Sequence, residues 1–137
     1  MPLGVTVARA EIMTWEPGAH ASTFGGNPVC LAAALETIRL LEEKYVANSA
    51  RMGEFLRTKL ERLKDRHPQV VDVRGRGLMI GLQLATGELR DAVINECFRR
   101  GLLILGAGAS TIRLSPPLLI DEEQATFAVE VISECLG

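Results

Sequence analysis

The sequence predicts an α/β protein of the α+β type, a two-layer ββαββα sandwich preceded by a strand, a loop and long helices. Three observations lead to this prediction. Apolar residues alternate along short segments in the second half of the chain, and they recur at helical spacing in the segments around them. Glycines, prolines and capping residues separate these segments. This order favours an antiparallel or mixed sheet with helices on one face.

The first part of the chain is expected to contain a strand, a loop and a helix. Residues 3–13, LGVTVARAEIM, contain β-branched valines typical of a strand. The glycine-rich loop GAHASTFGGN follows. Asn27 is a favourable N-cap and Pro28 a favourable first helical residue, so a helix is expected to run to about Lys44.

A second helix and two strands come next. Asn48 or Ser49 is expected to open this helix, and His67-Pro68 to end it, because the residue before a proline is pushed out of the helical region. The segments 70–75 and 78–84 are short and extended, and four apolar residues alternate along the second of them.

The remaining elements repeat this pattern. Residues 88–100 are expected to be helical and to stop at Gly101. The segments 102–106 and 111–114 are strand-like. Asp121 is expected to cap the last helix, with Gln124 completing a capping box.

Composition restricts the classes of function. The chain has 137 residues, 47% of them hydrophobic, which suits one domain or one domain with an appendage. A net charge of -2 and 4% aromatic residues favour neither nucleic acid nor an anionic membrane as a partner. Three cysteines, Cys30, Cys97 and Cys135, fall in predicted helices without a metal-binding pattern. They are expected to be buried free thiols, which suits a cytoplasmic protein.

The loop before Pro28 is a candidate anion site. Ser22 and Thr23 supply hydroxyls, two glycines let the backbone come close, and a helix N-terminus favours a phosphate. No Gly-Lys-Ser/Thr follows, so this is not a Walker P-loop. The alternative is an ordinary N-cap and turn.

Arg113 is the second candidate, because it interrupts the apolar segment TIRLSPPLLI. Its guanidinium could grip a carboxylate, or it could lie on an edge strand with its head in water. The RGRG segment, residues 74–77, is typical of a turn with solvated arginines. His20 and His67 have no obvious serine or carboxylate partner, so a catalytic triad has no support, and His67 is expected to be exposed.

Three ordered segments, GAHASTFGGNPVCLAAALETI, DVRGRGLMIGLQL and STIRLSPPLLI, closely resemble the C-terminal third of class III pyridoxal-phosphate aminotransferases of the ornithine and 4-aminobutyrate type. The resemblance covers essentially the whole chain and is somewhat nearer to the 4-aminobutyrate group than to the acetylornithine group. It implies the small C-terminal domain of fold-type I pyridoxal-phosphate enzymes. It also implies amino transfer from an amino acid to a 2-oxo acid, in a homodimer or a higher oligomer.

The resemblance also assigns residues. Thr23, with Ser22 beside it, would reach the pyridoxal 5'-phosphate of the neighbouring subunit, and Arg113 would bind the substrate carboxylate. Residues 1–44 would be the tail of the large cofactor-binding domain, and 45–137 the small domain.

The resemblance implies that the chain is incomplete. The family's Schiff-base lysine lies upstream of the matching segments, so no catalytic residue is expected in this chain and no turnover alone. Lys44, Lys59 and Lys64 all lie in predicted helices. The connection in GLQLATGELRDAV is shorter than is usual in the family. A racemase or decarboxylase of the same family, or a non-enzymatic assembly module, remain alternatives.

Overall fold

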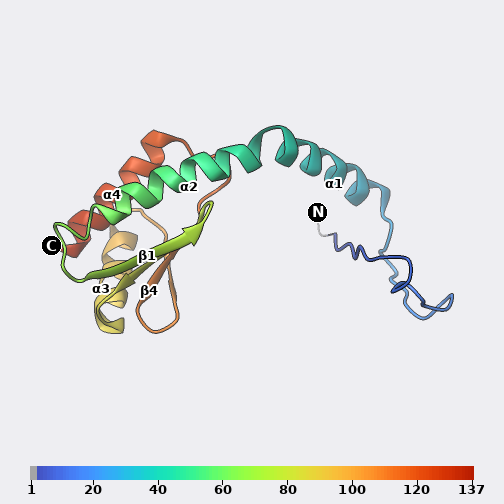
Figure 1. Ribbon diagram of the computed structural model, residues 1–137, viewed down its shortest axis with the longest axis horizontal. Coiled ribbons are helices and arrows are strands. Elements are labelled where there is room, and N and C mark those ends of the chain that lie inside the picture. The colour runs from blue at the N-terminus through green and yellow to red at the C-terminus, as the bar shows by residue number, and fades with distance from the viewer. Residues whose placement is uncertain (1–2) are drawn as a thin grey trace. The chain divides into compact units, whose positions relative to one another are not determined.

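The computed structural model describes residues 3–137 and forms two compact units, Met1–Glu43 and Lys44–Gly137, which we describe separately. The first contains the loop and the first helix, and the second contains the sheet (Figure 1). The elements are α1 (Pro28–Leu40), η1 (Leu41–Tyr45), α2 (Val46–Glu61), β1 (Val70–Arg76), β2 (Met79–Leu84), α3 (Gly87–Arg99), β3 (Leu105–Ala107), β4 (Thr111–Leu114) and α4 (Glu122–Leu136).

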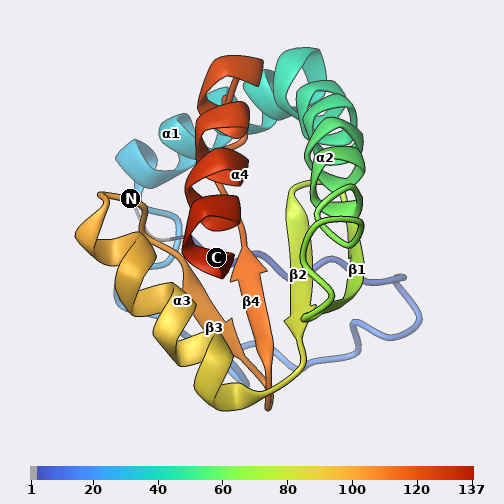
Figure 2. The ribbon, with the colours of Figure 1, turned by 90° about the vertical axis from the view of Figure 1, so that its left-hand side faces the viewer.

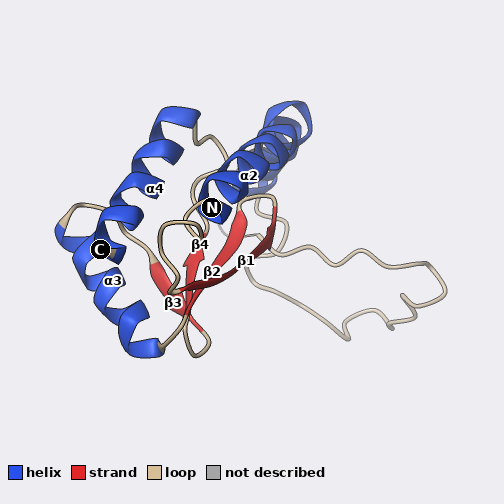
Figure 3. Cartoon of the chain, turned by 60° about the vertical axis from the view of Figure 1, so that its left-hand side comes forward, coloured by secondary structure: helices blue, strands red, loops and turns tan. Residues whose placement is uncertain are grey.

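The C-terminal unit is the predicted ββαββα sandwich. Its four strands run in the spatial order β1-β2-β4-β3, and every neighbouring pair is antiparallel. Helices α2, α3 and α4 lie on one side of the sheet (Figures 2 and 3). α2 contacts β1 and β2, α3 contacts β2, β3 and β4, and α4 packs against α2 and α3. The predicted fold is therefore confirmed for this unit.

The strands bury one face and leave the other open. Ile80, Leu82 and Leu84 are at most 1% exposed, so the alternation predicted for this strand is confirmed. They pack with Ile112 of β4 and with the apolar faces of the helices. The opposite face, which we call the open face, carries the side chains between them, such as Met79, and no helix of the C-terminal unit covers it.

Three predicted helix boundaries are confirmed. The Asn27 side chain caps α1. Asp121 and Gln124 form a complete capping box at the start of α4. Gly101 follows α3 with φ of 82°, and its N–H donates to the carbonyl of Phe98.

The strand predicted for residues 3–13 is wrong. This segment is irregular, it ends in a turn in which the Ile12 N–H donates to the Arg9 carbonyl, and Val5 and Val7 are exposed. A strand needs a neighbour to satisfy its backbone groups. Within residues 3–137 no strand pairs with this segment.

The predicted break between the first two helices is also wrong. Helical structure continues from α1 through the five π-helical residues of η1 into α2. Asn48 does not cap a helix, because its amide donates to the carbonyls of Leu118 and Ile120 at 2.7 and 3.1 Å. Ser49 accepts a hydrogen bond from the Leu78 N–H. α2 ends at Glu61, before the predicted stop at the proline.

The strand predicted for 102–106 is shorter and shifted to Leu105–Ala107. Its partner β4 is followed by Ser115 and two prolines. Because proline has no N–H to donate, the ladder cannot continue beyond this point.

The cysteine prediction holds in full only for Cys97. All three cysteines are free and helical, but Cys30 and Cys135 are half-buried. The pKa of the Cys97 thiol is raised to about 12, mainly by burial and to a smaller extent by a hydrogen bond with Cys135. Cys97 is therefore a protonated core residue at neutral pH, not a nucleophile.

Candidate functional site

The loop before α1 presents two exposed hydroxyl groups. Ser22 and Thr23 both lie at the surface of the N-terminal unit. The Gly25 N–H donates to the Ser22 carbonyl at 3.2 Å, which closes a turn, and Gly26 has φ of 70°. Within residues 3–137 neither hydroxyl is engaged in a hydrogen bond, so both are available to a ligand.

The amides at the start of α1 are not free. Asn27 Oδ1 accepts from the N–H groups of Val29 and Cys30 at 3.0 and 3.2 Å, and Pro28 has no N–H. The first amides of α1 are therefore capped by Asn27. Any phosphate held here would depend on the two hydroxyls and the loop backbone.

Arg113 lies on an inner strand of the C-terminal unit. β4 is between β2 and β3, so Arg113 is not on an edge strand, although its side chain is exposed as that alternative expected. Its neighbours Ile112 and Leu114 point into the core, while Arg113 lies on the open face and is exposed. Within residues 3–137 its guanidinium has no hydrogen-bond or ion-pair partner. It is thus free to bind an anion bidentately.

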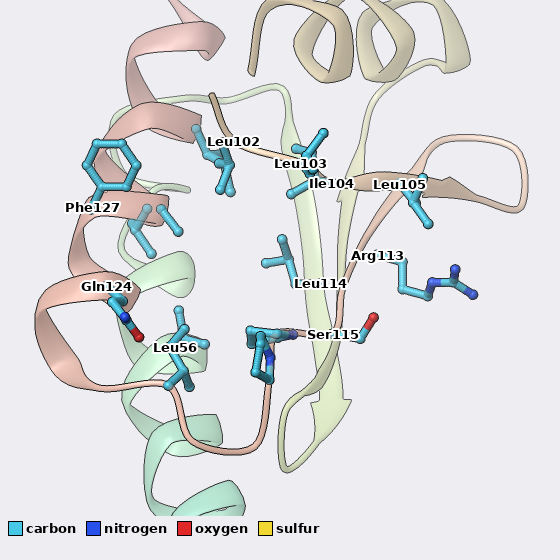
Figure 4. A pocket seen from close by; sticks show the side chains of 16 residues that line it. Leu56, Leu102, Leu103, Ile104, Leu105, Arg113, Leu114, Ser115, Gln124 and Phe127 are labelled. Atoms are coloured by element: carbon cyan, nitrogen blue, oxygen red, sulfur yellow. The ribbon is translucent and has the colours of Figure 1, made fainter. Parts of the chain in front are cut away.

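An apolar groove adjoins Arg113. The groove has a volume of about 710 Å³ and is lined mainly by leucine, isoleucine and proline side chains, and of the residues that line it only Arg113 is charged. Figure 4 shows Arg113 and Ser115 at one end and Phe127 at the other, with the guanidinium pointing away from Leu114. The guanidinium points away from the other labelled side chains, so a carboxylate bound to it would lie on the open face of the sheet.

The loop after β4 is tied to α2. Asn48 binds two of its carbonyls, as described above, and Arg51 pairs with Glu122 at 2.6 Å just after it. These links fix the wall of the groove next to Arg113. Sequence reasoning missed the role of Asn48, because its partners are 70 and 72 residues away.

Arg74 is exposed, as its RGRG setting indicated, but its guanidinium is engaged in hydrogen bonds. It donates to Asp72 at 2.9 Å, to Gln83 at 2.8 Å and to Thr111 at 3.2 Å. Asp72, two residues earlier on the same face of β1, was the one sequence signal that could have indicated this pairing.

His67 was predicted to be exposed and without a serine partner, and both predictions are wrong. The residue is 7% exposed, and Nε2 lies 2.9 Å from Ser133 Oγ on α4. The Nδ1 atom is buried and has no hydrogen-bond partner among residues 3–137. A serine–histidine pair is therefore present without an orienting carboxylate, so a catalytic triad still has no support.

Lys44 and Lys59 lie in helical segments as predicted, whereas Lys64 lies in the turn after α2, so the helix predicted there is wrong. Lys64 pairs with Glu61 at 2.7 Å, Lys59 lies over the ring of Phe55, and Lys44 lies over the ring of Tyr45. Residues 3–137 contain no cluster of three side chains that could hold a metal ion. No helix in this range has the length and apolar character to cross a bilayer.

Comparison with known proteins gives one consistent result. A family model described as aminotransferase class-III matches residues 1–136. The acetylornithine aminotransferase of Caldanaerobacter subterraneus is 33% identical over 99% of this chain and 35% of its own length. Ornithine aminotransferase 1 of Staphylococcus aureus is 41% identical over 97% of this chain and 33% of its own length.

Solved structures agree. The crystal structure of acetylornithine aminotransferase from Elizabethkingia anophelis superposes with a TM-score of 0.80 and 32% identity, over 89% of this chain and 33% of that one. The chain thus spans about a third of the length of the relatives it matches. The nearer resemblance to the 4-aminobutyrate group stays a prediction.

Proposed function

The chain belongs to the class III aminotransferase family, and on that premise we propose that it supplies the substrate-carboxylate contact for amino transfer from an ornithine- or 4-aminobutyrate-like amino acid to a 2-oxo acid. The observation that carries this proposal is Arg113. Among residues 3–137 its guanidinium has no partner, and Arg113 lies on an inner strand and borders an apolar groove. An arginine fork matches both oxygens of a carboxylate.

The cofactor contact is the second part of the proposal. Thr23, with Ser22 beside it, would donate its hydroxyl to the phosphate of pyridoxal 5'-phosphate held by a neighbouring subunit. The exposed hydroxyls fit this role, whereas the capped amides of α1 do not. When bound, the cofactor supplies the electron sink for the reaction. In this arrangement residues 1–44 are the tail of the large domain, and 45–137 are the small domain.

Replacing Arg113 tests the proposal. We expect Arg113→Gln to weaken binding of 2-oxoglutarate, used as the probe, by at least about tenfold, because a charge-assisted bidentate pair is lost. The dissociation constant of Arg113→Lys should lie between those of the unaltered chain and Arg113→Gln, because lysine keeps the positive charge but lacks the planar fork. Isothermal titration calorimetry gives the dissociation constants.

The control for this experiment is Arg76→Gln. Arg76 is an exposed arginine of the same sheet, and its replacement removes the same charge. If both glutamine variants weakened binding equally, the effect would be one of net charge, and the role of Arg113 would be rejected.

We also expect the chain to associate. The apolar residues of α1 recur at helical spacing, yet the helix has no buried residue, and Leu31, Leu35 and Ile38 are all exposed. An exposed apolar stripe of this kind favours packing against another subunit. Light scattering should give at least a dimer, and a stable monomer at micromolar concentration would contradict this part of the proposal.

A further inference from the structure

Arg74 crosses the open face at a point where β2 has no side chain. In the register of the sheet, Arg74 lies opposite Gly81, and Gly81 lies opposite Arg113. A Cβ atom at position 81 would lie 3.1 Å from Thr111 Cγ2 and 3.8 Å from Arg74 Cγ. Gly81 therefore leaves the gap through which the Arg74 side chain reaches from β1 over β2 to β4.

The guanidinium of Arg74 joins three strands. Nη1 donates to Asp72 of β1 at 2.9 Å and to Gln83 of β2 at 2.8 Å, and Nη2 donates to Thr111 of β4 at 3.2 Å. Thr111 comes two residues before Arg113 and so shares its face of β4. The planar fork of arginine suits this set of acceptors, and the single ammonium of lysine does not.

The pairing also determines which arginine stays free. Of the residues in β1–β4, only Asp72 is acidic. Arg74 holds this carboxylate in an ion pair at 2.9 Å. Asp72 lies in the row of Gln83 and Thr111, next to the row of Gly81 and Arg113, so a carboxylate released by Arg74 would be the nearest acidic group of the sheet to Arg113.

We infer that Arg74 is a positioning residue for Arg113: it fastens Thr111 across the Gly81 gap and keeps Asp72 engaged, so that Arg113 offers an unpaired guanidinium to a carboxylate ligand. This inference rests on the proposed role of Arg113. It adds that the anion affinity of Arg113 depends on an arginine that does not touch the ligand.

The test compares two arginines of β1 in the full chain. Arg74→Gln and Arg76→Gln remove the same charge from the same strand, but only the first breaks the network. We expect Arg74→Gln to weaken 2-oxoglutarate binding about fivefold, as is usual for coupled neighbours, and Arg76→Gln to weaken it less than twofold. Adding Asp72→Asn to Arg74→Gln should restore part of the affinity, because the competing carboxylate is then removed.

The variants also distinguish a failure of this inference from a failure of the proposed function. Equal effects of the two glutamine variants would overturn the inference while leaving Arg113 in its role. If Arg74→Gln fails to fold, Thr111→Val breaks the link to β4 without a change of charge. Unchanged affinity of Thr111→Val for 2-oxoglutarate would overturn the inference. If Arg113→Gln binds as well as the unaltered chain, it is the proposed function that fails.

The inference can also be tested without a ligand. If the unaltered chain does not bind 2-oxoglutarate, the NMR signal of the Arg113 Nε–H group still reports the surroundings of this guanidinium. That signal should shift in Arg74→Gln and stay in place in Arg76→Gln. An unmoved signal in both variants would overturn the inference.

Discussion

Replacing Gly53 by alanine is expected to destabilise the C-terminal unit by about 2 kcal/mol, although alanine is the better helix former. Gly53 is buried in the middle of α2. A Cβ atom there would lie 2.2 Å from the carbonyl oxygen of Gly77 and 2.4 Å from its carbon. Both are backbone atoms of the turn between β1 and β2, so no side chain can rotate away.

Two opposing effects decide whether Gly53→Ala stabilises or destabilises the C-terminal unit. Alanine gains about 1 kcal/mol over glycine in a helix interior. Overpacking a core costs about 1–3 kcal/mol and more where the backbone itself must move. The turn is also tied to α2, because the N–H of Leu78, the residue after Gly77, donates to Ser49 Oγ at 3.4 Å. The clash therefore outweighs the gain in propensity.

Urea unfolding of the two chains gives the difference in free energy. The matched control is Thr58→Ala, an exposed position of the same helix, which should change stability by no more than about 0.5 kcal/mol. A Gly53→Ala chain as stable as the unaltered one would show that α2 does not pack on the turn this closely.

The fold could be predicted from the sequence where the pattern that determines an element lies within a few neighbouring residues. The alternation in β2 determines which side chains are buried, and the capping box of α4 lies within four residues. Such patterns need no knowledge of the rest of the chain. The order ββαββα followed from them directly.

The errors share a physical cause, which is dependence on distant partners. The segment 3–13 has strand-like residues, but a strand forms only beside another strand. Asn48 is a good cap by type, yet carbonyls 70 and 72 residues away bind its amide. His67 next to a proline looks exposed, and only α4 brings Ser133 to it.

The candidate site shows the same division. The residue type of Arg113 was informative, because an arginine within an apolar strand is costly unless it has a function or reaches water. Its place on an inner strand required the spatial order of the sheet. The network of Arg74 depends on the register that sets Gly81 between two arginines, and the linear sequence does not contain that register.

Mixed with pyridoxal 5'-phosphate, ornithine and 2-oxoglutarate, the chain is expected to form no detectable glutamate. Transamination needs a lysine amine that can bond covalently to the cofactor, in a pocket that lowers its pKa or places it against the ring. The chain has three lysines, and Lys44 and Lys59 lie over neighbouring rings while Lys64 pairs with Glu61. None of the three lines the groove beside Arg113.

The loss of transamination should be complete, because no binding contact can replace the covalent bond between a lysine and the cofactor. The intact Staphylococcus aureus relative, assayed in parallel, shows that the conditions support turnover. Borohydride reduction followed by peptide mass spectrometry provides a second readout, in which no single lysine should be labelled preferentially. Glutamate formation that stops on replacing one of the three lysines by arginine would contradict the proposal and identify the reactive amine. In that case Arg113 could still bind the substrate carboxylate, because its contact and the covalent step are chemically independent.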